Sequence, residues 1–189
     1  VKYVEVEDEA AFYGPKVDIQ LKSIIGRTET MSTVQLDFAA KKRFELTYTD
    51  NEGKENNDVF VIHRAPLSTH ERFMAFLIEH YAGIWPTWMS PIQVAVLPIG
   101  EMHEEYAKTV KDELKKAGVR TKLWTDDGLG KRIRKAKVEK VPYQIVIGDK
   151  ERDTKTVTIE GRNDLKLEQI AVEEFVMRIT EEIKNRKDK

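Results

Sequence analysis

The sequence contains no cysteine among its 189 residues, which excludes a disulfide framework and a zinc site built on thiolates of this chain. It also has no long hydrophobic run. The most apolar stretch, VAVLPI at residues 94–99, is far too short to cross a bilayer. The first ten residues lack the basic and apolar regions of a signal peptide. These absences favour a cytoplasmic protein with no membrane role.

An excess of charge of one sign is missing as well. The chain has 32 Lys and Arg residues against 33 Asp and Glu residues, which gives a formal net charge of -1. The molecule as a whole therefore has no field that attracts nucleic acid, and any such site must be a local basic patch. With 40% hydrophobic residues, the chain can bury one large core or two small ones.

The first half of the chain has the pattern of antiparallel β structure. The polar segment 49–58, which contains Gly53, predicts a hairpin loop. Alternating or β-branched stretches predict strands of one sheet at residues 17–24, 33–38, 43–48 and 59–63.

A helix is predicted after these strands. Ser68 and Glu71 form a capping-box pattern, in which Ser68 accepts from the backbone N–H of Glu71 at the start of the helix. Gly83 and Pro86 end the helix. Its apolar face is made by residues at three- and four-residue spacing, namely Phe73, Phe76, Leu77 and Tyr81.

The second half of the chain changes character after the segment WPTWMSP at residues 85–91, where we place a domain boundary. Strands then alternate with helices, which predicts an α/β domain with a mostly parallel or mixed sheet. Strands are expected at 94–99, 119–124 and 143–147, with an edge strand at 154–159. Helices are expected at 102–117, 129–140 and 167–184.

Four strings occur in order: AFYGPKVDI at 11–19, TVQLDF at 33–38, VIHRAPLSTHERF at 61–73 and PTWMSPIQV at 86–94. In this order and spacing they resemble threonyl-tRNA synthetases over essentially the whole chain. The resemblance implies that residues 1–90 are the C-terminal portion of a class II catalytic domain, a partial antiparallel sheet with the motif 3 helix. Residues 91–189 resemble the anticodon-binding domain shared by the synthetases for threonine, histidine, proline and glycine.

Two residues of the third string carry the chemistry that the resemblance implies. Arg72 matches the motif 3 arginine that lies against ATP, a catalytic role suited to the always charged donors of a guanidinium. His63 matches a ligand of an active-site zinc, whose other protein ligands in the family, a Cys and a His, precede residue 1. From the residues alone, a solvated helix arginine and a structural strand histidine remain open for these positions.

The same resemblance places four polar residues in the threonine and adenylate pocket: Tyr13, Lys16, Thr33 and Gln35. From the residues alone, Lys16 could instead be a turn lysine, and Gln35 could be a polar strand residue that faces water. The sequence departs from the family nearby, because Glu-Thr-Met-Ser at 29–32 stands where Trp-Gln-Cys-Gly is common. Thr30 therefore occupies the place of a substrate-touching glutamine.

A basic run precedes the string VPYQIVIGDKE at 141–151 and brings six cations into residues 131–140. Such a run can neutralise several phosphates, although it can also be a solvated helix face. The residues expected to bind tRNA are Lys131, Arg134, Lys135, Lys140 and Glu151. Glu151 matches a position that hydrogen-bonds an anticodon base. The family often has Arg where Glu160 stands, and Asn or Lys near Asp127.

The resemblance implies a threonine–tRNA ligase that uses ATP with Mg²⁺ and a zinc ion, acts on threonine and tRNA(Thr), and is a homodimer as the complete protein. It implies no DNA partner. The chain alone is expected to be inactive, because the motif 1 and motif 2 segments are absent from it. The alternative is a non-catalytic, synthetase-like module that binds tRNA or another RNA.

Overall fold

A computed structural model describes residues 2–162 and 166–187 of the chain. The chain divides into two units, Val1–Ala82 and Gly83–Lys189. The boundary between functional domains that we place between residues 90 and 91 stays a prediction.

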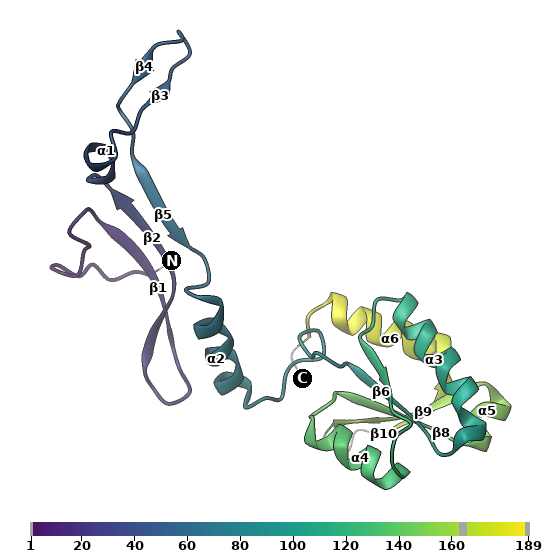
Figure 1. The fold of residues 1–189 in the computed structure, drawn as a ribbon. Helices are drawn as coiled ribbons and strands as arrows, with labels where there is room; N and C mark the ends of the chain where they lie inside the picture. The colour runs from purple at the N-terminus through teal and green to yellow at the C-terminus, as the bar shows by residue number, and fades with distance from the viewer. Residues whose placement is uncertain (1, 163–165, 188–189) are drawn as a thin grey trace. The chain divides into compact units, whose positions relative to one another are not determined.

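The N-terminal unit is built on an antiparallel sheet in the order β1-β2-β5 (Figure 1). Strand β1 covers Lys16–Lys22, β2 covers Thr28–Asp37 and β5 covers Val61–Ala65. Lys16 lies opposite Gln35, and Gln35 lies opposite His63. Because residues directly opposite each other project to the same side of a sheet, this register decides which side chains meet.

The strand predicted at residues 43–48 is wrong. Residues Ala40–Arg43 form the short helix α1, which the carboxylate of Asp37 caps by accepting from the backbone N–H groups of Ala39 and Ala40. The chain therefore turns away from the sheet at a point where the alternating pattern alone indicates extended backbone.

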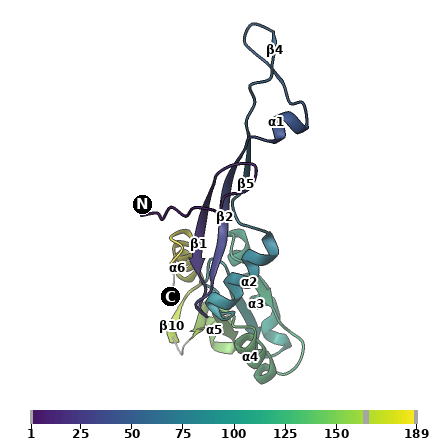
Figure 2. The ribbon, with the colours of Figure 1, turned by 90° about the vertical axis from the view of Figure 1, so that its left-hand side faces the viewer.

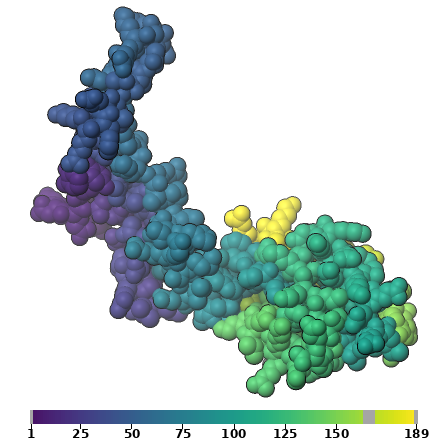
Figure 3. All heavy atoms as spheres, viewed as in Figure 1, coloured from purple at the N-terminus to yellow at the C-terminus, as the bar shows by residue number. Residues whose placement is uncertain are grey.

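The predicted hairpin loop is present, but its strands form a separate sheet. Strand β3, Tyr48–Thr49, pairs with β4, Glu55–Asn56, and their hairpin stands out as an arm from the rest of the unit (Figures 2 and 3). The turn is closed by Asp50, whose Oδ1 accepts from the backbone N–H groups of Glu52 and Lys54. The expectation that all strands of this half share one sheet is therefore wrong as well.

Helix α2, His70–Tyr81, follows β5. Its N-cap is Thr69, whose Oγ1 accepts from the backbone N–H of Arg72, so the capping box predicted at Ser68 and Glu71 is wrong by one residue. Ser68 has a φ of 56°, a left-handed conformation unlike the extended backbone of an N-cap residue. The helix ends at Ala82, which is also left-handed.

The C-terminal unit contains a mixed sheet in the order β10-β9-β8-β6-β7. Strand β6 runs parallel to β7 and β8, whereas β9 is antiparallel to β8 and β10. The strands are β6 Val94–Pro98, β7 Thr121–Leu123, β8 Tyr143–Ile147, β9 Thr156–Gly161 and β10 Lys166–Ala171. The predicted α/β domain with a mixed sheet is confirmed.

Two predictions for the C-terminal unit are wrong, the place of β9 in the sheet and the start of the last helix. Strand β9 is not an edge strand, because β10 pairs with its outer side. The closing helix, predicted from residue 167, is α6 and begins at Val172. The short apolar pattern before Val172 fits a strand or a helix, and pairing with β9 decides between them.

Helices cover both faces of this sheet (Figure 1). The helices are η1 Glu101–His103, α3 Glu104–Lys116, α4 Leu129–Val138, α5 Asp149–Thr154 and α6 Val172–Lys184. Residues of α3 and α6 pack with Ile145 and Ile159 into the larger core, and Ala136 of α4 packs with Leu97 and Trp124 on the other face. In the described parts of the chain, no helix has the length and apolar character needed to span a membrane.

Candidate functional site

The strand residues predicted to line the threonine pocket and to hold the zinc gather on one face of the sheet in the N-terminal unit. Lys16 and Asp18 on β1 lie opposite Gln35 and Thr33 on β2, and His63 on β5 lies opposite Gln35. These side chains therefore project to the same side. We call this side the polar face.

The other side of the same sheet carries most of its apolar residues, together with Ser32 and Arg64. Val17 lies opposite Val34, and the two are 68% and 40% exposed; Ile62 on β5 is 64% exposed. The separation of polar from apolar residues follows from the two-residue period of a strand, so the sequence alternation itself builds the polar face.

Hydrogen bonds join the predicted pocket residues into one chain. The hydroxyl of Tyr13 donates to Oε1 of Gln35, and Nε2 of Gln35 lies 3.4 Å from Oγ1 of Thr33. Thr33 donates to Oδ1 of Asp18 at 2.6 Å, and Lys16 Nζ lies 2.8 Å from Oδ2 of the same carboxylate. The structure thus joins Tyr13, Gln35 and Thr33 directly and links Lys16 to them through Asp18.

Asp18 is a member of the polar face that the sequence reasoning missed. Its hydrogen bonds to Lys16 and then to Thr33 hold the pKa of the Asp18 carboxyl below its usual value. The same ion pair raises the pKa of Lys16. The signal was present in the sequence, because Lys16 and Asp18 are two positions apart on one strand and share a face.

His63 is also tied to the polar face, through a second missed carboxylate. Nε2 of His63 lies 2.8 Å from Oδ2 of Asp37, and the ring of Tyr13 meets the imidazole edge to face with centroids 5.7 Å apart. The hydrogen bond from His63 is the main reason that the pKa of Asp37 is lowered. Asp37 continues the alternation of Thr33 and Gln35, which is the signal that could have found it.

The described residues do not form a complete metal site by themselves. No group of three His, Cys, Asp or Glu side chains suited to a metal ion occurs within residues 2–162 and 166–187. His63 nevertheless fits the part of a single ligand, because metal-binding histidines commonly donate their other ring nitrogen to a carboxylate. Its contact with Asp37 has this form.

Arg72 lies on α2, outside the hydrogen-bonded chain. Its backbone N–H donates to Thr69, and its side chain is exposed. The structure thus brings the predicted pocket residues and His63 together but does not bring Arg72, the predicted catalytic residue, to them.

A β-bulge lies where the sequence departs from the family. The pairing of β1 with β2 shifts between Ile19, opposite Ser32, and Gln20, opposite Thr30. Met31 is the extra residue, and it is 4% exposed. Because Gln20 is on the same face of β1 as Asp18, the bulge returns Thr30 to the polar face, in spite of its odd spacing from Thr33.

The basic run forms α4, and its cations have unlike environments. Lys131 pairs with Asp127 at 3.1 Å, and Lys135 lies over the ring of Trp124 at 5.2 Å from its centroid. Both lysines and Arg134 are exposed. These three residues remain candidates for a basic RNA-binding surface.

Arg132 does not belong to that surface. Its side chain is buried at 6% exposure, with Nη1 donating to the carbonyl of Trp124 at 2.9 Å and Nη2 to that of Ile99 at 3.5 Å. Lys137 is paired with Glu160 at 3.0 Å. Of the six cations in this run, Arg132 is therefore buried and does not add to the exposed basic surface.

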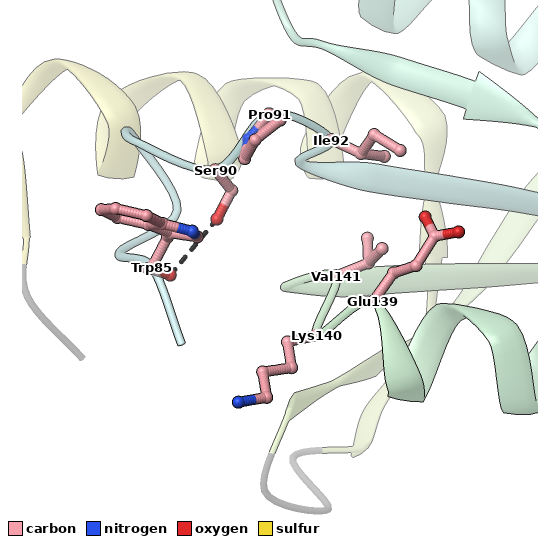
Figure 4. Close-up of a pocket in the computed structure, with 7 residues that line it drawn as sticks. All are labelled: Trp85, Ser90, Pro91, Ile92, Glu139, Lys140 and Val141. Carbon is pink, nitrogen blue, oxygen red and sulfur yellow. Dashed lines mark hydrogen bonds between the residues drawn. The ribbon is translucent and has the colours of Figure 1, made fainter. Parts of the chain in front are cut away.

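Lys140 lies apart from this helix surface, just after α4, where two hollows meet. One hollow, of about 270 Å³, is mainly apolar and is lined by Trp85, Ile92 and Val141, with Lys140 at its side (Figure 4). The other, of about 320 Å³, has several charged residues in its lining. Its lining includes Lys137, Lys140, Gln144, Glu160 and Arg162.

Glu151 is held at the N-terminus of α5. Its Oε2 accepts from the backbone N–H of Gly148 at 2.9 Å, and its Oε1 accepts from Thr158 at 2.8 Å. Burial alone would raise the pKa of Glu151, but these hydrogen bonds hold it below the usual value. Both carboxylate oxygens already have a structural partner, so a base contact by Glu151 would have to share or displace one of them.

Two protein families match the two halves of the chain. Residues 1–81 match the core domain of class II tRNA synthetases for glycine, histidine, proline, serine and threonine, and residues 93–182 match the anticodon-binding domain. Together with the fold, these matches define the class as class II aminoacyl-tRNA synthetases.

Individual relatives narrow the class. The threonine–tRNA ligase of Exiguobacterium sp. is 47% identical over 185 residues, which are 97% of this chain and 28% of that protein. Threonine–tRNA ligase 1 of Bacillus subtilis is 45% identical over 184 residues, or 96% of this chain and 28% of that protein. A crystal structure of the RNA binding domain of threonyl-tRNA synthetase from Cryptosporidium parvum Iowa II superposes with a TM-score of 0.77 at 34% identity, covering 92% of this chain and 44% of that one.

The chain belongs to the threonyl-tRNA synthetase family and corresponds to its C-terminal part, the end of the class II core followed by the anticodon-binding domain. It spans about 28% of the length of the curated relatives that it matches. The predicted resemblance is confirmed.

Proposed function

We propose that the chain serves in a threonine–tRNA ligase, which joins threonine to its tRNA at the expense of ATP. The observation that carries this proposal is the hydrogen-bonded chain from Tyr13 through Gln35, Thr33 and Asp18 to Lys16 on one sheet face. Such a set offers an amide, hydroxyls and a charged pair to a polar substrate, and its members already hold one another in place.

Within this function the polar face receives threonine and its adenylate. Gln35 and Tyr13 orient the amino acid through hydrogen bonds, and Lys16 balances phosphate or carboxylate charge. Arg72 contacts ATP, whose phosphates also hold Mg²⁺, and its fixed guanidinium stabilises the charge that develops at the leaving group.

His63 would be one ligand of the zinc ion. When bound, the zinc supplies a Lewis acid that recognises the amino and hydroxyl groups of threonine. The contribution of this chain is to hold the imidazole at a fixed place, against Asp37 and the ring of Tyr13.

The C-terminal unit binds the anticodon arm of tRNA(Thr). Lys131, Arg134 and Lys135 on the exposed side of α4 attract the phosphates, with Lys140 near the end of the helix and Glu151 as the base-reading candidate. Complementary local charge is needed because the whole chain has a net charge of only -1.

A binding titration tests this assignment. The 189-residue chain should bind an anticodon stem-loop of tRNA(Thr) more tightly than a random hairpin, and the affinity should fall steeply with salt. Replacing Lys131, Arg134 and Lys135 by Ala should abolish the preference. A matched control removes three exposed lysines of α3, which covers the opposite face of the sheet: Lys108, Lys115 and Lys116.

The control variant should keep its preference for the stem-loop. Equal losses in the two variants would show that net charge alone drives binding, and equal affinity of the unchanged chain for both RNAs would contradict the anticodon role.

The chain alone is not expected to form threonyl-adenylate. It spans about 28% of its relatives, and no complete metal site occurs among its described residues. Threonine-dependent exchange of pyrophosphate into ATP should therefore be absent for these residues by themselves, and measurable exchange would contradict the expectation.

The competing function, an RNA-binding module without catalysis, makes a different prediction. In a complete synthetase carrying this chain, replacing Gln35 by Ala should lower the exchange rate if the polar face holds threonine. An unchanged rate would favour the module.

A further inference from the structure

Asp37 is the most constrained carboxylate of the polar face. Its side chain is mostly buried, and the residue is 8% exposed. Its Oδ1 accepts from the backbone N–H groups of Ala39 and Ala40, both at 2.8 Å, and its Oδ2 lies 2.8 Å from Nε2 of His63. One oxygen thus caps helix α1 while the other meets the imidazole.

Because one oxygen of Asp37 is held by the backbone and the other faces the imidazole, the carboxylate determines which ring nitrogen of His63 carries the proton. An ionised carboxylate only accepts hydrogen bonds, so Nε2 must be the donor. In a neutral imidazole only one ring nitrogen is protonated, and the lone pair is then on Nδ1. The carboxylate cannot turn toward the opposite arrangement without losing the two backbone donors that hold Oδ1.

The imidazole ring is held as well. Tyr13 meets it at a ring-plane angle of 64°, and the hydroxyl of the same tyrosine is bonded to Gln35, the residue opposite His63 on β2. The ring of His63 is therefore positioned by a carboxylate and by an aromatic side chain that is itself anchored.

We propose that Asp37 is a positioning residue that fixes the Nε2–H tautomer of His63, so that Nδ1 is the atom presented to the zinc ion. This inference rests on the metal role of His63 in the proposed function. It assigns to Asp37 the part of the outer carboxylate that orients a metal-binding histidine.

Replacing Asp37 by Asn tests the proposal, because the amide has one acceptor instead of two. The backbone N–H groups of Ala39 and Ala40 require that oxygen, so the NH₂ group faces His63. Nε2 must then accept a hydrogen bond, and the proton moves to Nδ1. The substitution keeps the size of the side chain but inverts the tautomer.

The readout is the tautomer itself, seen in long-range ¹H–¹⁵N spectra of the His63 ring at a pH where the imidazole is neutral. The unchanged chain should show Nε2–H and the Asp37→Asn variant Nδ1–H. The matched control is Asp18→Asn, which changes the other carboxylate of the polar face and should leave Nε2–H in place. A purely structural role of Asp37 would not invert the tautomer.

Three outcomes are decisive. An Nδ1–H tautomer in the unchanged chain overturns the proposal, even if the Asp37→Asn variant does not fold. An Nε2–H tautomer in a folded Asp37→Asn variant also overturns it. In a complete synthetase carrying this chain, the variant should bind zinc about 10- to 100-fold more weakly. An inverted tautomer with unchanged zinc affinity would instead refute the metal role of His63.

Discussion

Arg132 and Arg134 lie two positions apart on helix α4, and we predict that their replacement affects different properties. Arg132 is buried and donates to the carbonyl groups of Trp124 and Ile99. Arg134 is exposed. Arg132→Met should therefore cost stability, whereas Arg134→Ala should cost RNA affinity.

The magnitude for Arg132 follows from its contacts. The hydrogen bond to Trp124, at 2.9 Å, is a charge-assisted bond, of a kind that stabilises by about 1.5–3 kcal/mol. The contact with Ile99 at 3.5 Å adds little, and Nε of Arg132 is buried without a partner, which lowers the net gain from the side chain. Methionine keeps most of the packing of the aliphatic stem.

We therefore expect the free energy of unfolding of the C-terminal unit to fall by about 2 kcal/mol in Arg132→Met. A loss of this size corresponds to a decrease in Tm of roughly 8–16 °C for a small domain. Arg134→Ala should change the free energy of unfolding by less than about 0.5 kcal/mol. It should reduce the slope of log K against log salt for the anticodon stem-loop by about 0.7–0.9, the contribution of one phosphate contact.

The assay combines urea unfolding with anisotropy titrations of a labelled stem-loop at several salt concentrations, below the unfolding transition of both variants. The reasoning is refuted if folded Arg132→Met loses the salt slope expected for Arg134→Ala. It is equally refuted if Arg132→Met unfolds at the same urea concentration as the unchanged chain.

Two further predictions concern pH. The pKa of Glu151 is held below its usual 4.5, so the contribution of Glu151 to stability is present above that value and is lost as pH falls through the lower folded value. Glu151→Gln should therefore be less stable than the unchanged chain at neutral pH, and urea titrations should show this difference in the free energy of unfolding disappearing in acid. Tyr106 has its pKa raised by burial from 10 to about 12, so stability is full below pH 10 and declines as pH rises through this range. The Tm of Tyr106→Phe should therefore decline less steeply with pH in this range than the Tm of the unchanged chain. Equal slopes of Tm against pH for both proteins would contradict the burial of the phenol.

The polar face shows how much a sequence pattern can predict. The alternation places Thr33 and Gln35 on one side of a strand, but the family resemblance is what led us to expect these residues and His63 in an active site. Asp18 alternates with Lys16 on β1, and Asp37 alternates with Gln35 on β2. Both were missed, because a carboxylate on a strand carries no signal of the side chain that it will meet.

Other errors have a different physical origin. At residues 43–48 the alternation indicated a strand, but a side-chain cap by Asp37 starts a helix just before it. Ahead of Val172, pairing with β9 overrides a pattern that also fits a helix. Arg132 was grouped with its charged neighbours because charge alone does not show which positions of a helix face the core.

The bulge at Met31 lets β2 hold one extra residue without changing which side chains share the polar face. Deleting Met31 would restore regular pairing and leave Thr30 opposite Gln20 on the polar face, because Thr30 would then lie two positions from Thr33. The bulge lies between the β1–β2 turn and the segment that contains Thr33 and Gln35. The bulge thus divides β2 into an end near the turn that tolerates altered spacing and a segment whose spacing is fixed by the site.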